Sequence, residues 1–376
     1  MLASAVAEVD ASKDCVNIVH VETGRHFYGG AQQVIWLIRG LMDQGVGSLL
    51  VCPAATQIDD NARHAGLPVH NLPCSGELDV LFAWRLFRLL RRERPDLVHV
   101  HSRRGADFPG GWAALAARIP AIITRRVDSA ESGAGVRIRY RPFQKVVAIS
   151  EHVAKVLRES GVARERIAVV RSAVDVDAIT YPADRQRLDD EFGIKSGQFA
   201  IAVVAQLIRR KGHRFLLDVL PGLVAEHPGI KVVFFGTGAE ESRLKALTAK
   251  LGLSASVIFP GFRADLDDYL AAFDLLVHPA DREGLGVALL KAAAAGLPVI
   301  AFDVAGCSEA VQSGKTGILV PQGNLSALQL AIGLLITEPG IRQSLGAAGR
   351  RRMQDEFRVS TMVESYLQTY AEILYG

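Results

Sequence analysis

The sequence predicts an α/β protein made of two doubly wound, parallel-sheet domains. Short apolar runs alternate with longer amphipathic segments along its 376 residues, which is the pattern of βαβ units with buried parallel strands. The alternation pauses once, near the middle of the chain, and then resumes. Hydrophobic residues make up 49% of the chain and charged residues 22%, so its composition is that of a globular protein large enough for two cores.

Seven apolar runs in the first half are expected to form strands. They cover residues 17–24, 48–53, 69–74, 97–102, 121–127, 145–150 and 167–172. Apolar residues at helical spacing fill most of the intervals, for example 31–42 and 107–117. These elements form the predicted N-terminal domain, residues 1–175.

The alternation of apolar runs and amphipathic segments is interrupted at residues 176–197, where apolar content drops and Pro, Gly and charged residues increase. We therefore expect a linker there. Six further runs predict the sheet of a second domain, residues 198–356; they cover 199–207, 231–238, 257–262, 275–280, 298–304 and 317–321. The chain is expected to be helical from Ile341 onward. Doubly wound sheets bind ligands beyond the carboxyl ends of their strands, and two facing sheets predict a site in a central cleft.

Several classes of protein are excluded. No apolar run approaches the ~18 residues of a membrane span, and the N-terminus MLASAVAEVDASKD has acids where a signal peptide is basic and apolar, so we expect a cytoplasmic protein. Cys15, Cys52, Cys74 and Cys307 are scattered without a CxxC pair, which indicates buried reduced thiols rather than a zinc site or disulfides. No nucleic-acid-binding motif is present, and nucleic acid is not an expected partner.

Arginine is concentrated in the first half, where residues 1–175 hold 20 arginines and three lysines. Arginine suits bidentate contact with phosphate or carboxylate. One segment, WRLFRLLRRER, contains Arg85, Arg88, Arg91, Arg92 and Arg94, and on a helix Arg85, Arg88 and Arg92 form a basic face opposite Leu86, Phe87, Leu89 and Leu90. Such a face is either simply solvated or contacts anionic lipid headgroups, and both interpretations stay open.

Two glycine-rich turns follow predicted strands. Gly29 and Gly30 open the first helix, where backbone N–H groups can approach an anion, although a tight βα turn also needs glycine. Gly236 and Gly238, in FFGTGAEESRL, are similar, but the third glycine and the distant acidic residue of a dinucleotide fingerprint are missing. We interpret the second turn as lying near a nucleotide rather than as an NAD site.

The most specific segment is HPADREGLGVALLKAAAAGLPVIAFDVAGCSEAV, residues 278–311. It places a carboxylate, Glu283, and the backbone amides of Gly284 and Gly286 at the start of a helix that follows a strand. A carboxylate accepts hydrogen bonds from sugar hydroxyls, and amides at a helix N-terminus hold a diphosphate. Lys211, after the first strand of this domain, is suited to neutralise a leaving phosphate. Taken singly, each is equally well explained as an ordinary loop residue.

Together these segments resemble the family 4 retaining glycosyltransferases. VVAQLIRRKGH, FFGTGAEESRL, VIFPGF, LVHPADREGLGVALLKAAAAGLPVIAFDVAG and GILVPQGN match the C-terminal half of that family in order, and YGGAQQ, HVHS and KVVAIS match its first domain. The resemblance implies a GT-B fold, with the nucleotide-sugar donor held by the second domain and the acceptor by the first. It also implies that the last helix, in residues 357–376, crosses back to the first domain.

The resemblance assigns roles residue by residue. Glu283 matches the motif glutamate that contacts donor sugar hydroxyls, and Lys211 matches the lysine that binds the donor diphosphate. The remaining donor-binding candidates lie in the matching loops: Gly29, Gly30, Gln206, Arg210, Gly236, Gly238, Gly284, Leu285, Gly286, Lys291 and Glu309. Of these, Glu309 matches a family glutamate near the nucleotide.

Three positions depart from the family pattern. Lys291 stands where a second glutamate usually holds the ribose, and Gln206 stands where an arginine is frequent. A lysine only donates hydrogen bonds, so Lys291→Glu, which restores the pattern, is expected to be tolerated. Arg125 and Arg126 replace a histidine, which predicts a more cationic acceptor side together with Arg103 and Arg104.

The implied reaction is transfer of a sugar, most simply from a UDP-sugar, with retention at the anomeric carbon. Lys211, nearby arginines and a helix N-terminus are expected to stabilise the leaving diphosphate without a metal or other cofactor. Two DxD spacings, at Asp175/Asp177 and Asp265/Asp267, are interpreted as structural. His101 is a candidate catalytic residue pointing toward the cleft, or else a packed histidine.

The leading hypothesis is a transferase that builds a cell-envelope glycan or glycolipid such as lipopolysaccharide, with peripheral contact to anionic lipid of the inner membrane on its cytoplasmic face. The alternative, motivated by Lys291 and Gln206, is a non-catalytic nucleotide-sugar-binding or scaffold protein of the same fold. A dinucleotide oxidoreductase rests only on the strand–helix alternation and is disfavoured by the missing fingerprint. The sequence does not identify the base, the sugar, the acceptor or the oligomeric state.

Overall fold

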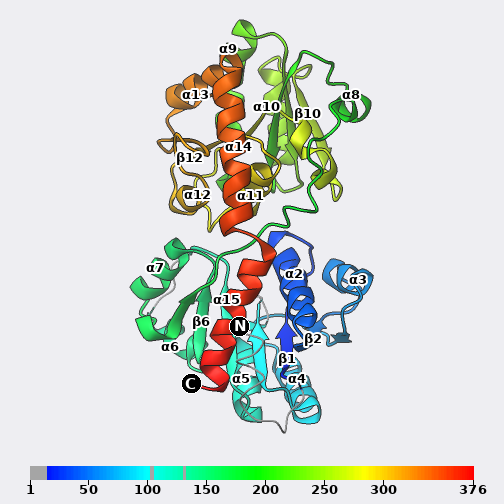
Figure 1. Cartoon of the computed structure of the whole chain (residues 1–376), viewed down its shortest axis with the longest axis vertical. Helices are drawn as coiled ribbons and strands as arrows, with labels where there is room; N and C mark the ends of the chain where they lie inside the picture. The colour runs from blue at the N-terminus through cyan, green and yellow to red at the C-terminus, as the bar shows by residue number, and fades with distance from the viewer. Residues whose placement is uncertain (1–14, 102–105, 130–132) are drawn as a thin grey trace. The chain divides into compact units, whose positions relative to one another are not determined.

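A computed structural model describes residues 15–101, 106–129 and 133–376, in two compact α/β units (Figure 1). The first unit comprises Met1–Ala173 and Val359–Gly376, and the second comprises Val174–Arg358. Each unit is built on one parallel sheet whose strands are connected by helices. The predicted fold class is therefore confirmed.

The first sheet has seven parallel strands in the order β3-β2-β1-β4-β5-β6-β7. Its strands are β1 Asn17–Val21, β2 Gly47–Cys52, β3 Val69–Asn71, β4 Leu97–Val100, β5 Ala121–Arg125, β6 Lys145–Ala148 and β7 Ile167–Val169. Each falls within or next to a predicted apolar run. In this register His20 of β1 lies directly beside His99 of β4.

The helices of the first unit are α2 Gly29–Asp43, α3 Gln57–His64, α4 Val80–Glu93, α5 Asp107–Ala117, α6 Gly133–Tyr140, α7 Glu151–Glu159 and the C-terminal α15 Val359–Leu374, with a 3-10 turn, η1, at Arg164–Arg166. Side-chain caps fix several starts: Asp79 accepts from the backbone N–H of Phe82 at α4, and Ser150 accepts from that of Val153 at α7.

Helix α15 belongs to the first unit although 185 residues of the second unit precede it. Figure 1 shows it, in red, lying along α2 in that unit. Met362, Val363 and Tyr366 of α15 are buried in one cluster with Leu37 and Leu41 of α2. Burial of this apolar face attaches the end of the chain to the first sheet.

The second sheet has six parallel strands in the order β10-β9-β8-β11-β12-β13. They are β8 Phe199–Val204, β9 Ile230–Phe235, β10 Val257–Gly261, β11 Leu275–His278, β12 Val299–Phe302 and β13 Gly317–Val320. The helices are α8 Gln186–Phe192, α9 His213–Glu226, α10 Glu241–Lys250, α11 Val287–Ala294, α12 Ala305–Ala310, α13 Leu325–Thr337 and α14 Pro339–Glu356, with 3-10 turns η2 Arg209–Lys211, η3 Leu266–Asp268 and η4 Leu270–Ala272.

The segment predicted as a linker, residues 176–197, lies inside the second unit. It carries α8, and Ile179, Leu188 and Ile194 are almost fully buried. These few large apolar residues pack the segment into the second unit, while most of the polar residues between them face solvent and lower its average hydrophobicity. Low average hydrophobicity therefore does not mark a free linker here.

All four cysteines are free, but only Cys52 and Cys307 are buried. Cys15 is exposed and Cys74 is half-buried, so the prediction of four buried thiols is wrong for these two. None of the helices that the structure describes combines the length and apolar character needed to cross a bilayer.

Candidate active site

The switch point of the second sheet lies between β8 and β11. The chain leaves β8 outward through β9 and β10 and then returns to the other side of β8 as β11. The loops that follow β8 and β11 therefore leave the carboxyl edge where doubly wound sheets bind ligands. Lys211 lies in the first loop and Glu283 in the second, and their side chains meet.

Glu283 is the centre of a largely buried polar cluster. Its Oε2 accepts hydrogen bonds from Nζ of Lys211 and from Nε2 of His278, the latter at 2.9 Å, and its Oε1 accepts from the backbone N–H of Gly284 at 3.2 Å. The side chains of Lys211 and Glu283 are each 12% exposed, and that of His278 is 1% exposed. The three residues form a shielded, directly bonded set at the switch point.

The cluster holds Glu283 as a carboxylate. Burial alone raises the pKa of Glu283, but the hydrogen bond from His278 and the charge of Lys211 outweigh it and hold that pKa well below its usual range. Burial lowers the pKa of His278, so its imidazole is neutral. Because a carboxylate only accepts, Nε2 of His278 carries the proton. Its Nδ1 is buried without a hydrogen-bond partner among the described residues.

Close backbone approach locks the two loops together. Gly212 has φ +69°, and a Cβ there would lie 1.8 Å from the carbonyl oxygen of Pro279. The backbone N–H of Asp281 donates to the carbonyl of Arg210 at 2.9 Å. On the other side, a Cβ at Gly306 would lie 2.1 Å from the carbonyl oxygen of Glu283. The positions of Lys211 and Glu283 are thus fixed by backbone as well as by their ion pair.

The other donor-side candidates lie on the same carboxyl edge. Gly284, Leu285 and Gly286 form the turn that leads into α11, with Gly286 as its N-cap residue. Gln206 and Arg210 follow β8, and Gly236 and Gly238 follow β9. Glu309 lies half-buried on α12, and its backbone carbonyl accepts a hydrogen bond from Arg352 at 2.9 Å.

Lys291 has a partner that the sequence analysis missed. Its Nζ donates to both carboxylate oxygens of Asp267, at 2.7 and 3.0 Å, and the two side chains are 17% and 21% exposed. Asp265, the other acid of this DxD spacing, is bound by Arg263 at 2.6 and 2.8 Å. Both carboxylates of the pair are therefore already held by cations of the protein.

In the first unit the switch point lies between β1 and β4. Gly29 and Gly30 begin α2 after β1, and His101 directly follows β4. His101 is only 2% exposed, and its Nε2 lies 3.0 Å from Nδ1 of His20. The structure thus places His101 in a buried network, as the packed alternative expects.

That network contains three imidazoles that are near enough to share a metal ion. One ring nitrogen from each of His20, His99 and His101 lies within 4.8 Å of the others. Both nitrogens of His99, however, are bonded to hydroxyls at 2.7 Å, one to Tyr370 of α15 and one to Thr124 of β5. Burial lowers the pKa of His20 to about 3 and those of His99 and His101 well below their usual range. We interpret the cluster as neutral histidines that fasten α15 to the sheet.

The predicted acceptor-side arginines differ sharply. Arg125 is 4% exposed and donates to the carbonyls of Val127 and Ser129, at 3.1 and 2.6 Å. Arg126 is half-buried, and it forms no hydrogen bond or ion pair with the residues that the structure describes. Its Cδ lies 3.3 Å from where a Cβ on Gly30 would be, at the start of α2. Arg103 and Arg104 lie outside the described residues.

Sequence reasoning missed His278, which orients Glu283. Its only signal is a histidine inside the apolar strand run LLVHPA, five residues before the glutamate. Asp267 was set aside as part of a structural DxD spacing, and its contact with Lys291 depends on a tertiary fold that spacing does not reveal.

Two family models match the chain and together span most of it. "Glycosyltransferase Family 4" matches residues 28–178, and "Glycosyl transferases group 1" matches residues 184–352. The first match covers most of the first unit and extends five residues into the second, which begins at Val174, and the second match lies within the second unit.

Relatives agree with these matches. The lipopolysaccharide core biosynthesis glycosyltransferase LpsE of Rhizobium meliloti is 24% identical over 363 residues, 95% of this chain and 99% of that protein. EpsD of Bacillus subtilis is 32% identical over 188 residues, so the chain spans about half, 49%, of that relative. Among solved structures, Anabaena HepE in complex with UDP is similar, with a TM-score of 0.84 and 21% identity over 95% of this chain and 100% of that one. The chain belongs to the family 4 glycosyltransferases, and its fold is GT-B.

Proposed function

We propose that this glycosyltransferase moves a sugar from a UDP-sugar, with retention at the anomeric carbon, to an anionic cell-envelope glycan or glycolipid of lipopolysaccharide type. The single observation that carries the proposal is the Lys211–Glu283–His278 cluster at the switch point of the second sheet. The name of LpsE as a lipopolysaccharide core enzyme supports the acceptor class, and the UDP bound to HepE supports the nucleotide.

On the donor side, Glu283 is suited to orient the sugar. Its carboxylate stays ionised at neutral pH and retains acceptor capacity beyond the bonds to Lys211, His278 and Gly284. Lys211 adds a positive charge beside it, and the turn from Gly284 to Gly286 leads into the N-terminus of α11. Charge that develops on a leaving diphosphate is stabilised by such preorganised donors.

The reaction exchanges one glycosidic bond for another. The bond from the anomeric carbon to the diphosphate oxygen breaks, the acceptor oxygen bonds to that carbon on the same face, and the leaving phosphate takes the proton of the acceptor hydroxyl. His101 is not needed as a base in this scheme, which agrees with its burial. We propose that no metal takes part, because Asp265 and Asp267 are engaged by Arg263 and Lys291.

On the acceptor side, Arg126 is the arginine suited to an anion. A half-buried guanidinium without a counter-ion in the described part of the chain is unfavourable until an anion approaches it. A phosphate or carboxylate on the acceptor would supply that charge in bidentate form. Arg125 has its carbonyl partners already and serves the fold.

Two measurements test the proposal. A thermal-shift screen with UDP, GDP, ADP and their sugars is expected to show the largest stabilisation with UDP and a UDP-sugar, because a ligand that binds only the folded state raises Tm. Incubation with that donor and a lipopolysaccharide-type acceptor is expected to release free UDP, with and without EDTA, and to give an α-linked product from an α-linked donor. Stabilisation by GDP or ADP alone, an inverted product, or loss of turnover in EDTA would each refute the corresponding part.

We also propose that the enzyme works at the cytoplasmic face of the inner membrane, in peripheral contact with anionic lipid. The excess of arginine in residues 1–175 supports this.

A further inference from the structure

The start of α4 exposes a cluster of large apolar side chains. Leu78, Val80, Leu81 and Trp84 are 81%, 77%, 62% and 53% exposed. They lie within seven residues of one another, at the loop before α4 and on its first turns. We call these four residues the α4 tip. Exposed apolar side chains gathered in this way mark an interaction surface rather than the scattered exposure of an ordinary surface.

The remainder of α4 explains why the tip stays uncovered. Phe82, Leu86, Leu89 and Leu90 point into the first unit and are at most 4% exposed. The apolar residues that the sequence analysis placed opposite the arginines are therefore mostly core. Val80, Leu81 and Trp84 lie about 180° from that buried side, at 100° per residue. The solvent face of α4 thus begins apolar at its N-terminal end.

Further along the same face the side chains become basic. Arg88, Arg91 and Arg92 lie on the exposed face, one to three turns after the α4 tip. The guanidinium of Arg88 lies over the ring of Trp84, 4.9 Å from its centroid. Arg92 pairs with its neighbour Glu93 at 2.7 Å, whereas Arg88 and Arg91 form no ion pair with any residue that the structure describes.

Acidic residues at the tip do not cancel this charge. Asp79 is used as the cap of α4, where it accepts from the backbone N–H groups of Phe82 and Ser75, both at 2.8 Å. Glu77 lies 4.0 Å from Arg139. The exposed face therefore presents an apolar end followed by a band of positive charge.

We propose that the α4 tip inserts into the interfacial region of an anionic phospholipid bilayer, with Arg88, Arg91 and Arg92 at the phosphate headgroups. The order of chemistry along the face fits this partner: aliphatic side chains reach the acyl boundary, Trp84 lies at the interface, and arginines meet the phosphates. A groove on a protein would also accept the apolar residues. Arg88, Arg91 and Arg92, however, extend along more than one turn of α4, and an extended anionic surface such as a bilayer complements them better. The inference rests on the membrane contact proposed above and names the surface that makes it, but it does not depend on the transfer reaction.

The test is sedimentation of the full chain with vesicles of phosphatidylcholine alone and of phosphatidylcholine with 30% phosphatidylglycerol. Binding is expected only with phosphatidylglycerol, and it is expected to fall as salt rises. Arg88→Glu/Arg92→Glu is expected to weaken binding at least tenfold, since one basic residue near such a surface contributes about fivefold. Leu81→Ser is expected to weaken it several-fold, whereas Leu330→Ser, at a side chain 74% exposed on α13, serves as the matched control.

Tryptophan emission reports insertion directly. Trp84 is the one tryptophan among the large exposed apolar residues of the described chain, so its emission is expected to shift to the blue with phosphatidylglycerol vesicles and the shift to vanish in Trp84→Phe. Equal binding to neutral vesicles, or no binding to anionic ones, would overturn the membrane contact and this surface with it. Salt-sensitive binding to anionic vesicles that neither the charge variants nor the tip variants weaken would overturn the α4 surface alone. Circular dichroism and Tm of each variant verify that the fold is retained.

Discussion

The ion pair between Lys291 and Asp267 predicts an effect of Lys291→Glu that is opposite to the one expected from the sequence alone. Glutamate at position 291 would restore the family pattern, so the sequence alone predicts that Lys291→Glu is tolerated. In the structure, a glutamate there would place a second negative charge near the carboxylate of Asp267, where the ammonium group of Lys291 now binds both of its oxygens. We therefore expect Lys291→Glu to destabilise the second unit.

The magnitude follows from the burial of the pair. Exposed ion pairs contribute ~0.2–1 kcal/mol, whereas breaking a fully buried one costs ~3–5 kcal/mol. The side chains of Lys291 and Asp267 are 17% and 21% exposed, so we expect a loss between these limits, about 1–3 kcal/mol, for Lys291→Met. Repulsion adds roughly another 1–2 kcal/mol for Lys291→Glu. For a unit of this size, each kcal/mol lowers Tm by roughly 2–4 °C.

The assay is a double-mutant cycle in which urea unfolding gives the free energy of each variant. The swapped pair, Lys291→Glu with Asp267→Lys, is expected to recover at least half of the stability lost by Lys291→Glu alone. Lys245→Glu on α10, which breaks an exposed pair with Glu241, is the matched control and is expected to cost under ~1 kcal/mol. If Lys291→Glu is as stable as the parent, the ion pair does not have the role assigned to it.

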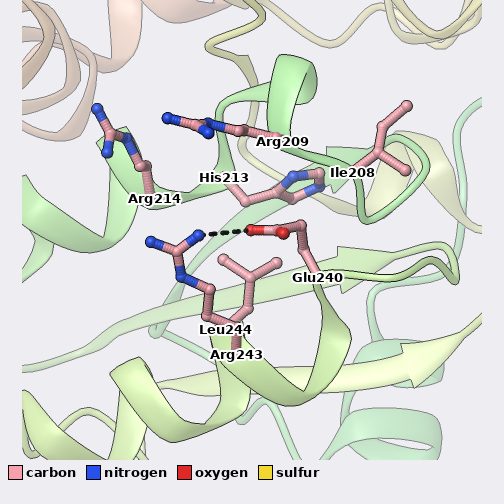
Figure 2. Close-up of a pocket in the computed structure, with 7 residues that line it drawn as sticks. All are labelled: Ile208, Arg209, His213, Arg214, Glu240, Arg243 and Leu244. Carbon is pink, nitrogen blue, oxygen red and sulfur yellow. Dashed lines mark hydrogen bonds and ion pairs between the residues drawn. The ribbon is translucent and has the colours of Figure 1, made fainter.

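Three further outcomes are expected. Burial lowers the pKa of His213 (Figure 2) to about 4 and that of His20 to about 3, whereas both histidines titrate near 6.5 in the unfolded chain. Because the unfolded state then binds more protons, the free energy of unfolding should fall as pH drops below about 6.5, by up to ~1.4 kcal/mol per pH unit for each histidine. Urea unfolding at pH 7.5 and 5.5 measures this fall, and His213→Phe should make it smaller. His278→Leu removes a hydrogen-bond donor to Glu283, so the pKa of Glu283 should rise and the acidic limb of the pH profile of kcat should move to higher pH. His278→Gln keeps a donor and should move that limb less. Identical pH profiles for the parent and His278→Leu would contradict the role of His278. Arg126→Gln should raise KM for an anionic acceptor about tenfold and leave donor hydrolysis unchanged, and an equal effect on a neutral acceptor would contradict the anion contact.

Much of the fold was predictable because parallel strands buried on both faces give continuous apolar runs. Each of the thirteen predicted runs overlaps a strand of the structure. Residues 176–197 were harder to interpret: they are polar on average, yet Leu188 and Ile194 pack into the second unit. The average composition of a segment does not reveal that a few buried apolar residues can attach it to a domain.

The candidate site was predictable where its chemistry lies in one loop. Glu283 with its glycines forms a local motif, and Lys211 follows a strand in the manner of phosphate-binding residues. The partners of these residues come from tertiary structure: His278 reaches Glu283 across a strand end, and Asp267 reaches Lys291 from 24 residues away. The same holds for Arg125 and Arg126. Their neighbours in the fold, and not their positions in the sequence, distinguish Arg125, which binds backbone carbonyls, from Arg126, which has no hydrogen-bond or ion-pair partner among the described residues.

The central claim is that Glu283, held ionised by Lys211 and His278, orients the donor sugar, and turnover of Glu283→Gln with a verified donor tests it most directly. The substitution keeps shape but removes the charge, so we expect kcat/KM to fall by about 10² or more, which is ~2.7 kcal/mol of transition-state stabilisation. Glu226→Gln, at an exposed position on α9, is the control and should keep full activity. Because the change leaves Lys211 unpaired, Glu283→Gln/Lys211→Met provides a charge-balanced variant that should fold stably and remain inactive. If folded Glu283→Gln turns over at nearly the parent rate, Glu283 does not have this role.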